Sequence, residues 1–269
     1  MIKAIVSGAA GRMGTHIIHV LSSSEGIALG AALEQKGHPL IGKYPGSIAG
    51  LPSNTVLPLI TDDLSEACKA NDVLIDFSSV NASIEHAKIC ADQKVPIVIG
   101  ATGFSPHQLE QIQAYARVIP CVLSPNMSIG VNLCFKILEE VAKTIGNDYD
   151  MEIIEAHHRL KKDAPSGTAM KMAHIIAEAV NRNLDEVGVY ARKGMIGERS
   201  SREIGIQTVR AGDIIGEHTV MFAGIGERIE ITHRAHSRET FAAGAVRAAK
   251  WLVGKKPGMY DMQDVLGLK

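Results

Sequence analysis

Residues 2–14, IKAIVSGAAGRMG, decide the fold of the chain. The apolar run 2–7 is of the kind that is buried in a parallel sheet. Three glycines follow it at a spacing of three residues, Gly8, Gly11 and Gly14. Residues 15–23, THIIHVLSS, then carry apolar side chains at helical spacing. Strand, glycine-rich turn and helix in this order predict the first unit of a layered α/β sheet.

The glycine turn is suited to holding a pyrophosphate. Glycine allows a tight turn and a close approach of backbone N–H groups, and the following helix directs its partially positive N-terminus at the phosphates. A plain strand-to-helix turn is the alternative interpretation. Glu34 favours the first, because it stands 20 residues after Gly14 at the end of a second apolar run, where a carboxylate binds a ribose 2′-OH. The sequence therefore predicts a nicotinamide dinucleotide cofactor.

The residues after Glu34 bear on which nicotinamide cofactor is used. A ribose that carries a 2′-phosphate favours arginine, whose planar fork binds phosphate through two hydrogen bonds. Gln35 stands here without a charge, although Lys36 follows it. We therefore expect NADH to serve at least as well as NADPH.

Strands and helices continue to alternate as far as residue 128. The expected strands lie at 26–34, 56–62 and 72–78, and in 95–103 and 119–128, which end in loops; the expected helices lie at 82–93 and 105–116. This rhythm predicts a Rossmann-like, doubly wound parallel sheet. Open sheets of this kind bind ligands at the carboxyl ends of their strands. We expect the loops 100–103 and 124–127, which follow two of the strands, to line the nicotinamide.

The pattern changes after residue 128. A longer amphipathic helix is expected at 130–146, a strand at 150–158 and a helix at 166–183. From 203 onward the expected strands are longer and are joined by turns, which is typical of an antiparallel sheet. Residues 129–238 are therefore predicted to form a smaller α+β domain with a mixed or antiparallel sheet. The helix at 240–255 is expected to return to the first domain, which comprises 1–128 and 239–269.

The composition describes a folded protein with no global attraction for polyanions. Of the 269 residues, 46% are hydrophobic and 21% are charged, which is typical of a globular chain with room for two domains. The formal net charge is −1, so neither nucleic acid nor a membrane surface is an expected partner. The chain has four scattered cysteines, no apolar run near the ~20 residues of a membrane span and no apolar signal core at its start. We expect reduced thiols and a cytoplasmic location.

The candidate reacting groups lie close together in a second stretch of the sequence, residues 152–169, EIIEAHHRLKKDAPSGTA. His157 and His158 provide imidazoles that titrate near neutral pH, and Lys161 provides a fixed ammonium. The helix that begins at Ser166-Gly167-Thr168 offers N–H donors to an anion. A histidine at the end of a strand is more often a core or surface residue, but here it has unusual neighbours. The combination suits a small dicarboxylate that is protonated as it is reduced.

The same stretch resembles the signature of the dihydrodipicolinate reductases, also called 4-hydroxy-tetrahydrodipicolinate reductases. The resemblance covers the whole chain, because further motifs of that family occur in the expected order: GAAGRMG, IDFS, VIGATGF, SPNMSIGVN, TVRAGDIIGEHTVMF and ERIEITHRAHSRETFAAGAV. It implies the reduction of a cyclic imine dicarboxylate with NADH or NADPH, in the diaminopimelate route to L-lysine. It also implies a homotetramer and a second domain that binds substrate and mediates assembly.

The resemblance assigns roles to individual residues. It makes His157 and Lys161 the acid/base residues and places Lys161 close to a substrate carboxylate. It implies substrate contacts at His158, Ser166, Gly167 and Thr168. It implies cofactor contacts at Gly8, Ala9, Ala10, Gly11, Arg12, Met13, Glu34, Gly100, Ala101, Thr102, Ser124, Pro125, Asn126 and Met127. No metal ion is expected. Which of His157 and Lys161 delivers the final proton is left open, and Arg238 is equally well a carboxylate ligand or a surface residue.

The sequence departs from better-known members of that family at three positions. Gln35 and Ser79 stand where arginine is frequent, which again argues against a strong preference for NADPH. Leu160 replaces a frequent histidine. A third histidine in this segment is therefore not expected to be essential.

Three rival interpretations explain the sequence less well. A reductase of another small substrate, such as aspartate or homoserine, would share the glycine turn but not the H-H-x-x-K spacing ahead of P-S-G-T. A cofactor-sensing regulatory protein would need a recognition helix or a basic patch, and neither is visible in the sequence. A metal site at His233 and His236 would need cysteine or carboxylate partners at ligand spacing, which are missing. Reduction of the cyclic imine is therefore preferred.

Overall fold

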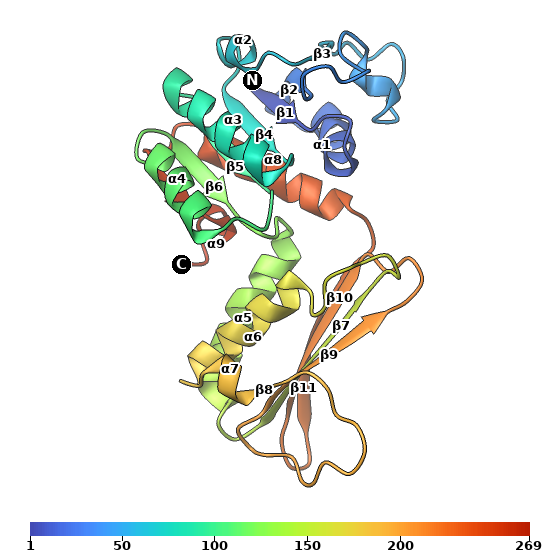
Figure 1. The fold of residues 1–269 in the computed structure, drawn as a ribbon, viewed down its shortest axis with the longest axis vertical. Coiled ribbons are helices and arrows are strands. Elements are labelled where there is room, and N and C mark those ends of the chain that lie inside the picture. The colour runs from blue at the N-terminus through green and yellow to red at the C-terminus, as the bar shows by residue number, and fades with distance from the viewer. The chain divides into compact units, whose positions relative to one another are not determined.

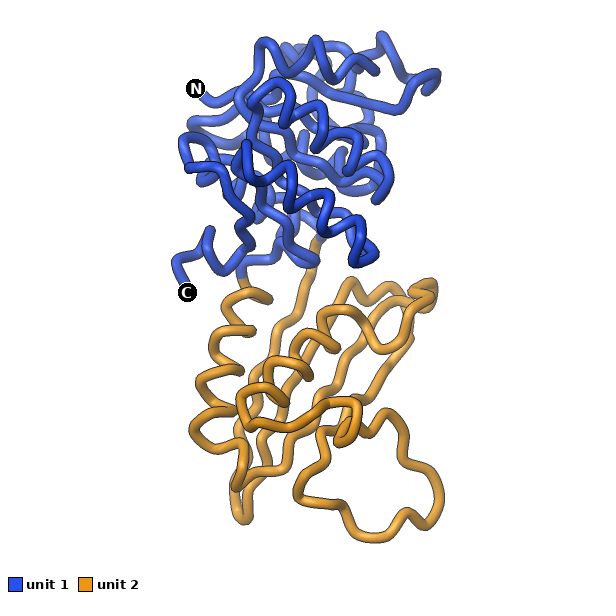
Figure 2. Tube along the Cα trace, turned by 60° about the vertical axis from the view of Figure 1, so that its left-hand side comes forward, with its two compact units in different colours: residues 1–129, 238–269 blue, residues 130–237 orange.

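The computed structural model describes residues 1–269, which form two compact units (Figure 2). Unit 1 comprises Met1–Ile129 and Arg238–Lys269, and unit 2 comprises Gly130–Ser237. Each apolar core is made only of residues from its own unit. None of the helices combines the length and the apolar character needed to span a bilayer. The chain thus leaves unit 1 after its sixth strand, builds unit 2 and then returns to complete unit 1.

Unit 1 is built on a seven-stranded sheet in which all neighbouring strands run parallel (Figure 1). The strand order is β12-β6-β5-β4-β1-β2-β3. The strands are β1 (Ile2–Ser7), β2 (Ile27–Leu33), β3 (Ile60–Thr61), β4 (Val73–Asp76), β5 (Ile97–Ile99), β6 (Pro120–Leu123) and β12 (Gly258–Tyr260). The chain extends in one direction from β1 and in the other from β4, so the order reverses between these two strands. Open α/β sheets bind ligands at such reversals.

Helices cover both faces of this sheet. Successive side chains of a strand point to opposite faces, and in β1 Val6 enters one apolar cluster while Ile5 enters the other. Helices α1 (Arg12–Ser22) and α8 (Glu239–Leu252) cover the Val6 face, and α2 (Leu64–Cys68), α3 (Val80–Gln93) and α4 (Pro106–Ala116) cover the Ile5 face. The short helices η1 (Pro45–Ser47) and α9 (Met262–Leu266) complete the unit. The predicted doubly wound Rossmann-like sheet is confirmed.

Two details of unit 1 differ from the sequence prediction. The strand expected at 56–62 is reduced to β3, because Pro58 has no N–H to donate to a ladder and Val56 is 96% exposed. The tail of the chain adds a strand that was not predicted, β12, which pairs with β6. Its three residues are too few to show a two-residue alternation in the sequence.

Unit 2 packs helices against one face of a five-stranded mixed sheet (Figure 1). Its elements are α5 (Ile129–Ile145), β7 (Asp150–His157), α6 (Gly167–Ala179), α7 (Leu184–Val187), β8 (Gly188–Val189), β9 (Ile204–Arg210), β10 (Gly216–Ala223) and β11 (Arg228–Ala235). The strand order is β11-β10-β7-β9-β8. Strand β10 runs antiparallel to β7 and β11, as predicted. Strand β9 was also expected in an antiparallel sheet, and this was wrong: it runs parallel to β7, because the connection through α6 is a crossover.

The central strand β7 changes character along its length. Met151 and Ile153 point into the apolar cluster under α5 and α6, and both are fully buried. Glu155 and His157 follow on the same face, because side chains two residues apart on a strand share a face. Both are also buried. One strand face therefore begins as hydrophobic core and ends as a buried polar group.

Candidate nucleotide and substrate sites

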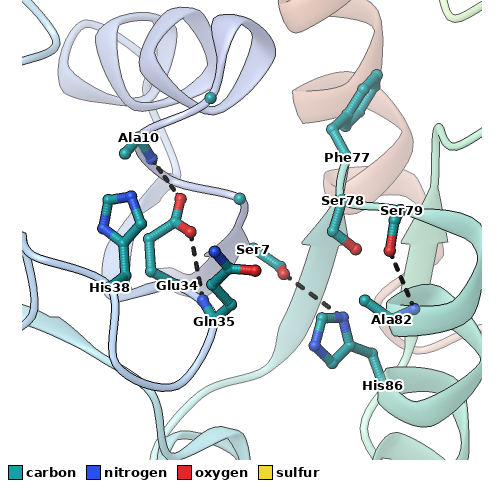
Figure 3. Close-up of a pocket in the computed structure, with 12 residues that line it drawn as sticks. Ser7, Ala10, Glu34, Gln35, His38, Phe77, Ser78, Ser79, Ala82 and His86 are labelled. Carbon is teal, nitrogen blue, oxygen red and sulfur yellow. Dashed lines mark hydrogen bonds between the residues drawn. The ribbon is translucent and has the colours of Figure 1, made fainter.

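A cavity of about 410 Å³ lies in unit 1, beside the carboxyl ends of β1, β2 and β4. It therefore opens at the reversal of strand order (Figure 3). Its walls are formed by Ser7, Gly8, Ala10, Gly11, Glu34, Gln35, His38, Phe77, Ser78, Ser79, Ala82 and His86. Gly8, Ala10, Gly11 and Glu34 of the predicted cofactor residues thus share one cavity.

The glycine turn is required by close backbone contacts. Gly8 has φ +70°, a conformation that L side chains rarely adopt. A Cβ atom on Gly14 would lie 2.0 Å from the carbonyl oxygen of Gly8 and 2.7 Å from Cα of Ala9, so α1 can approach β1 only with glycine there. Gly11 is the N-cap of α1, and no side chain caps the helix. The start of α1 therefore fits a phosphate group.

Glu34 connects the end of β2 to the glycine turn. One carboxylate oxygen accepts a 2.8 Å hydrogen bond from the N–H of Ala10, and the other accepts one from the N–H of Gln35 at 3.2 Å. Figure 3 shows the Glu34 side chain between these two residues at the cavity wall. A carboxylate has about four acceptor positions, so these two bonds leave capacity for ribose hydroxyls.

The opposite wall of the cavity, formed by β4 and α3, holds a buried carboxylate, Asp76, next to a histidine, His86, and this pair was not predicted. Asp76 is fully buried; its carboxylate accepts a 2.9 Å bond from the N–H of Ser78 and lies 3.1 Å from Nδ1 of His86. Burial alone would raise the pKa of Asp76, but the bonds to His86 and Ser78 outweigh it and lower the pKa. Ser79, which stands where arginine was noted as frequent, caps α3 by accepting a bond from the N–H of Ala82.

The remaining predicted cofactor residues do not line this cavity. Arg12 and Met13 begin α1, and Ala9 is buried beneath the turn. The Gly100–Thr102 and Ser124–Met127 segments follow β5 and β6 at the carboxyl edge of the same sheet. At Gly100 a Cβ atom would lie 2.3 Å from the Phe77 ring, so a larger residue there would require the ring to move. Their cofactor contacts stay predictions.

A buried carboxylate organises the candidate substrate site of unit 2. Glu155 is 0% exposed and accepts hydrogen bonds from four residues. One oxygen lies 2.6 Å from Nδ1 of His157 and 2.8 Å from Nη1 of Arg210. The other accepts bonds from Nη2 of Arg210 and the N–H of Ser166, both at 2.9 Å, and from Oγ1 of Thr208 at 3.3 Å. The carboxylate is thus fully engaged inside the protein.

The register of the sheet explains how these residues meet. Parallel pairing of β7 with β9 places Thr208 beside Glu155 and Arg210 beside His157. Antiparallel pairing with β10 places His218 on the other side of Glu155. The rings of His157 and His218 are in edge contact, with centroids 5.2 Å apart. Three strands therefore contribute to one polar cluster on the helix-covered face.

The protonation of this cluster follows from its contacts. Burial would raise the pKa of Glu155, but hydrogen bonds from Arg210, His157 and Ser166 outweigh it and lower the pKa, so the residue is a carboxylate. Burial lowers the pKa of His157, and the positive charges of Lys161 and Arg210 add to this against the opposing pull of Glu155. Neutral His157 therefore carries its proton on Nδ1, facing the carboxylate, and presents the lone pair of Nε2.

Lys161 is held by a neighbouring carboxylate. Its Nζ donates to both oxygens of Asp163, each at 2.9 Å. The ammonium lowers the pKa of Asp163. The Lys161 side chain is 20% exposed whereas that of Asp163 is 63% exposed, so Asp163 is the partner that solvent can replace. A substrate carboxylate could take its place on the ammonium.

The Ser166-Gly167-Thr168 turn begins α6. Ser166 is the N-cap: its Oγ accepts from the N–H of Ala169 at 3.2 Å and lies 3.0 Å from Nε2 of His218. Its own N–H already serves Glu155. Gly167 is exposed, and a Cβ atom there would meet nothing within 4 Å. The open part of the helix start is therefore at Gly167 and beyond, while Ser166 itself is buried.

The other candidate residues of this segment point elsewhere. His158 follows His157 on the opposite face of the chain and is half-buried. Leu160 is 77% exposed. Arg238 belongs to unit 1, where it precedes α8 and is half-buried. The roles given to His158 and Arg238 by resemblance stay predictions.

Comparison with known proteins identifies the chain's relatives. Residues 2–127 match the family model "Dihydrodipicolinate reductase, N-terminus", and residues 130–266 match "Dihydrodipicolinate reductase, C-terminus". The chain belongs to the dihydrodipicolinate reductase family. It is 56% identical to the 4-hydroxy-tetrahydrodipicolinate reductase of Syntrophus aciditrophicus and 55% identical to that of Geobacter sulfurreducens, over 100% of each chain.

A solved relative shares the fold along almost the whole chain. The dihydrodipicolinate reductase from Paenisporosarcina sp. TG-14, solved with dipicolinate bound, matches with a TM-score of 0.75 and 28% identity over 98% of each chain. Membership of the reductase family and the α/β architecture, both predicted from the sequence, are confirmed.

Sequence reasoning missed four members of the buried polar cluster in unit 2, which are Glu155, Thr208, Arg210 and His218. A signal existed for Glu155, because it stands two residues before His157 on a strand and must share its face. The other three come from strands far along the chain, so only the strand register brings them to β7. Of the predicted residues, the catalytic candidate His157 and the substrate-binding candidate Ser166 join this cluster directly.

Proposed function

We propose that this chain reduces 4-hydroxy-tetrahydrodipicolinate to tetrahydrodipicolinate, with unit 1 binding NADH or NADPH and unit 2 binding the substrate. One observation best supports this assignment of cofactor and substrate to the two units. It is the buried Glu155–His157 pair, which stands close in sequence to Lys161 and to the open start of α6. His157 supplies a titrating imidazole, and Lys161 and the start of α6 supply two anion-binding groups. All three lie in unit 2, whereas the cavity that suits a nucleotide lies in unit 1. The nicotinamide supplies a hydride when it is bound.

The dicarboxylate is proposed to bind through Lys161 and the first N–H groups of α6. A helix N-terminus attracts anions, and Gly167 leaves room for one to approach. Lys161 can exchange its exposed partner Asp163 for a substrate carboxylate. The dipicolinate bound in the solved relative is itself a ring with two carboxylates. Two such anchors would fix the ring in one orientation, and orientation removes much of the entropic barrier to reaction.

His157 is proposed to provide the proton that neutralises the reduced ring. Nε2 is the ring atom not engaged with Glu155, and a bound dianion would favour its protonated form. His157→Ala should therefore lower kcat by roughly 10²–10⁴-fold with little change in KM. Lys161→Ala should lower kcat and also raise KM, because it removes an anchor.

These variants are tested by following imine-dependent oxidation of NADH. Lys162→Ala is the matched control, because Lys162 is an exposed lysine next to Lys161 with no partner role in the cluster. The control should keep the wild-type constants. Wild-type kinetics in either the His157 or the Lys161 variant would contradict the assignment of that residue.

NADH is proposed to serve at least as well as NADPH. The cavity wall beside the ribose position carries the Glu34 carboxylate and neutral Gln35, and no arginine lines it. A 2′-phosphate would meet a negative charge there without a bidentate partner. Steady-state kcat/KM with both cofactors is the test, and a preference for NADPH of several hundred-fold would contradict the proposal.

The assembly is proposed to be a homotetramer formed through unit 2, in the cytoplasm. The sheet face opposite the helices exposes apolar side chains, with Ile154 39% and Val209 43% exposed. All four cysteines are unpaired, as expected in a reducing compartment. Light scattering on the purified protein tests the assembly, and a monomer at micromolar concentration would refute it.

A further inference from the structure

Glu155 has no acceptor capacity left for a substrate. A carboxylate offers about four acceptor positions, and Glu155 receives bonds from His157, Ser166 and Thr208 as well as two from Arg210. A buried carboxylate persists only when it is paired and hydrogen-bonded in this way. If its purpose were structural, the bidentate bond to Arg210 would suffice. The additional bonds to His157 and Ser166 need another explanation.

The first additional bond fixes the reacting atom of His157. Because the carboxylate can only accept, the Nδ1 atom of His157 must donate to it. Nε2 is then the atom that exchanges a proton. On that side the neighbouring strand carries Gly216, where a Cβ atom would lie only 3.1 Å from Nε2. A glycine at this place keeps Nε2 uncrowded.

The second additional bond fixes the start of α6. The Ser166 N–H donates to Glu155, and the Ser166 hydroxyl lies 3.0 Å from His218, whose ring is in edge contact with His157. The carboxylate that orients the imidazole therefore also anchors the turn that begins the anion-binding helix. A displacement of one would displace the other.

We propose that Glu155, held by Arg210, is the positioning residue of the reaction: it sets the tautomer of His157 and ties that imidazole to the substrate-binding turn at α6. The proposal rests on the proposed function, because it takes His157 as the proton donor. When Nε2 gives its proton to the ring, the imidazolium becomes a neutral imidazole that keeps its Nδ1–H bond to Glu155. Glu155 itself stays ionised throughout.

The charges around His157 determine how substitutions shift its titration. Glu155 favours the imidazolium, whereas Lys161 and Arg210 disfavour it. The ring of His218, which is in contact with His157, is neutral because burial lowers its pKa to about 3. Asp163 forms an ion pair with Lys161, at 2.9 Å. Glu155→Gln removes the favourable charge and should move the His157 inflection of kcat/KM to lower pH. Arg210→Gln removes an unfavourable charge and should move it to higher pH.

The kinetic test compares these two variants with a matched control. Glu155→Gln should lower kcat roughly 10²-fold, the lower end of what a proton donor contributes, with a smaller effect on KM. Glu152→Gln is the control: this glutamate lies on the same strand and pairs with Arg192 and Arg199, but it faces away from His157. The control should keep the wild-type pH profile. Equal shifts in both Glu→Gln variants, or shifts in the same direction for Glu155→Gln and Arg210→Gln, would overturn the proposal.

A direct measurement on the wild-type protein does not depend on how the variants fold. Histidine ¹⁵N NMR distinguishes the two neutral tautomers, with the His157 signals assigned from a His157→Gln variant. Neutral His157 should carry its proton on Nδ1 in the free enzyme; a proton on Nε2 would overturn the proposal. If instead the tautomer is as expected but His157→Ala is fully active, the proposed function of His157 fails and its positioning by Glu155 stands.

Discussion

His218 is a buried residue of the polar cluster in unit 2, and its lowered pKa makes the stability of the protein depend on pH. It is 4% exposed, and burial, with the charge of His157 adding to it once His157 is protonated, lowers its pKa from 6.5 to about 3. Between these two pH values the unfolded chain binds a proton that the folded chain does not. Stability must therefore fall as the pH drops below about 6.5, and by pH 5 this one residue costs about 2 kcal/mol.

His218→Gln should make the protein less sensitive to acid. The glutamine amide can reach the position of Nε2 and keep a bond to Ser166, but it does not titrate. Thermal unfolding measured from pH 7 to pH 5 should show a smaller loss of Tm in the variant, by roughly 5 °C. His157 and His233 also have lowered pKa values, so the variant should still lose some stability. Identical pH slopes for variant and wild type would contradict this account of His218.

At the scale of elements, the glycine turn and the polar cluster around Glu155 differ in how far the sequence could predict them. The turn is local: Gly8, Gly11 and Gly14 follow β1 directly, and their spacing already indicated a tight strand-to-helix connection. The cluster depends on which strands are neighbours. Periodicity predicted β7 and β9 as strands, but it carries no information on pairing direction, and β9 was assigned to the wrong kind of ladder. Arg210 could not be placed beside His157 without that register.

Gly14→Ala should disrupt the connection between β1 and α1. The new methyl group would lie 2.0 Å from the Gly8 carbonyl oxygen, and backbone atoms cannot move aside as a flexible side chain can. We expect a loss of about 1–3 kcal/mol of stability, typical of overpacking. NADH binding should weaken roughly tenfold or more, which corresponds to a loss of about 1.4 kcal/mol or more of binding free energy. Calorimetric titration with NADH and thermal unfolding measure the two effects.

Gly26→Ala is the control for this element. Gly26 precedes β2 and has φ +77°, so alanine is strained there, but it lies at the opposite end of the strand from the cavity. The variant should lose stability and keep its affinity for NADH. If both glycine variants weaken NADH binding equally, the effect of Gly14 is a general loss of stability and not a loss of the phosphate-binding turn.

The whole molecule is a discontinuous unit with a second unit inserted in it. The two chain segments of unit 1 meet where the insertion begins and ends: Oγ of Ser128 and Oγ1 of Thr240 are 3.4 Å apart. Close by, α8 approaches the chain before the insertion so nearly that a Cβ atom on Gly244 would lie 1.8 Å from the carbonyl oxygen of Met127. Helix α8 shares its apolar cluster with α1. The two chain segments of unit 1 are therefore held together by contacts among residues of unit 1 itself.

Unit 1 should consequently fold and bind nucleotide by itself. Replacing Gly130–Ser237 by a short Gly/Ser linker joins two ends that already lie together, and it removes no residue of either apolar core of unit 1. The shortened protein should unfold cooperatively on heating and bind NADH with an affinity close to that of the full chain, while it has no reductase activity. The same deletion combined with Gly14→Ala should bind NADH weakly, which separates binding in the cavity from non-specific binding. A shortened protein that melts without cooperativity, or that folds and does not bind NADH, would show that the inserted residues are needed for the nucleotide site.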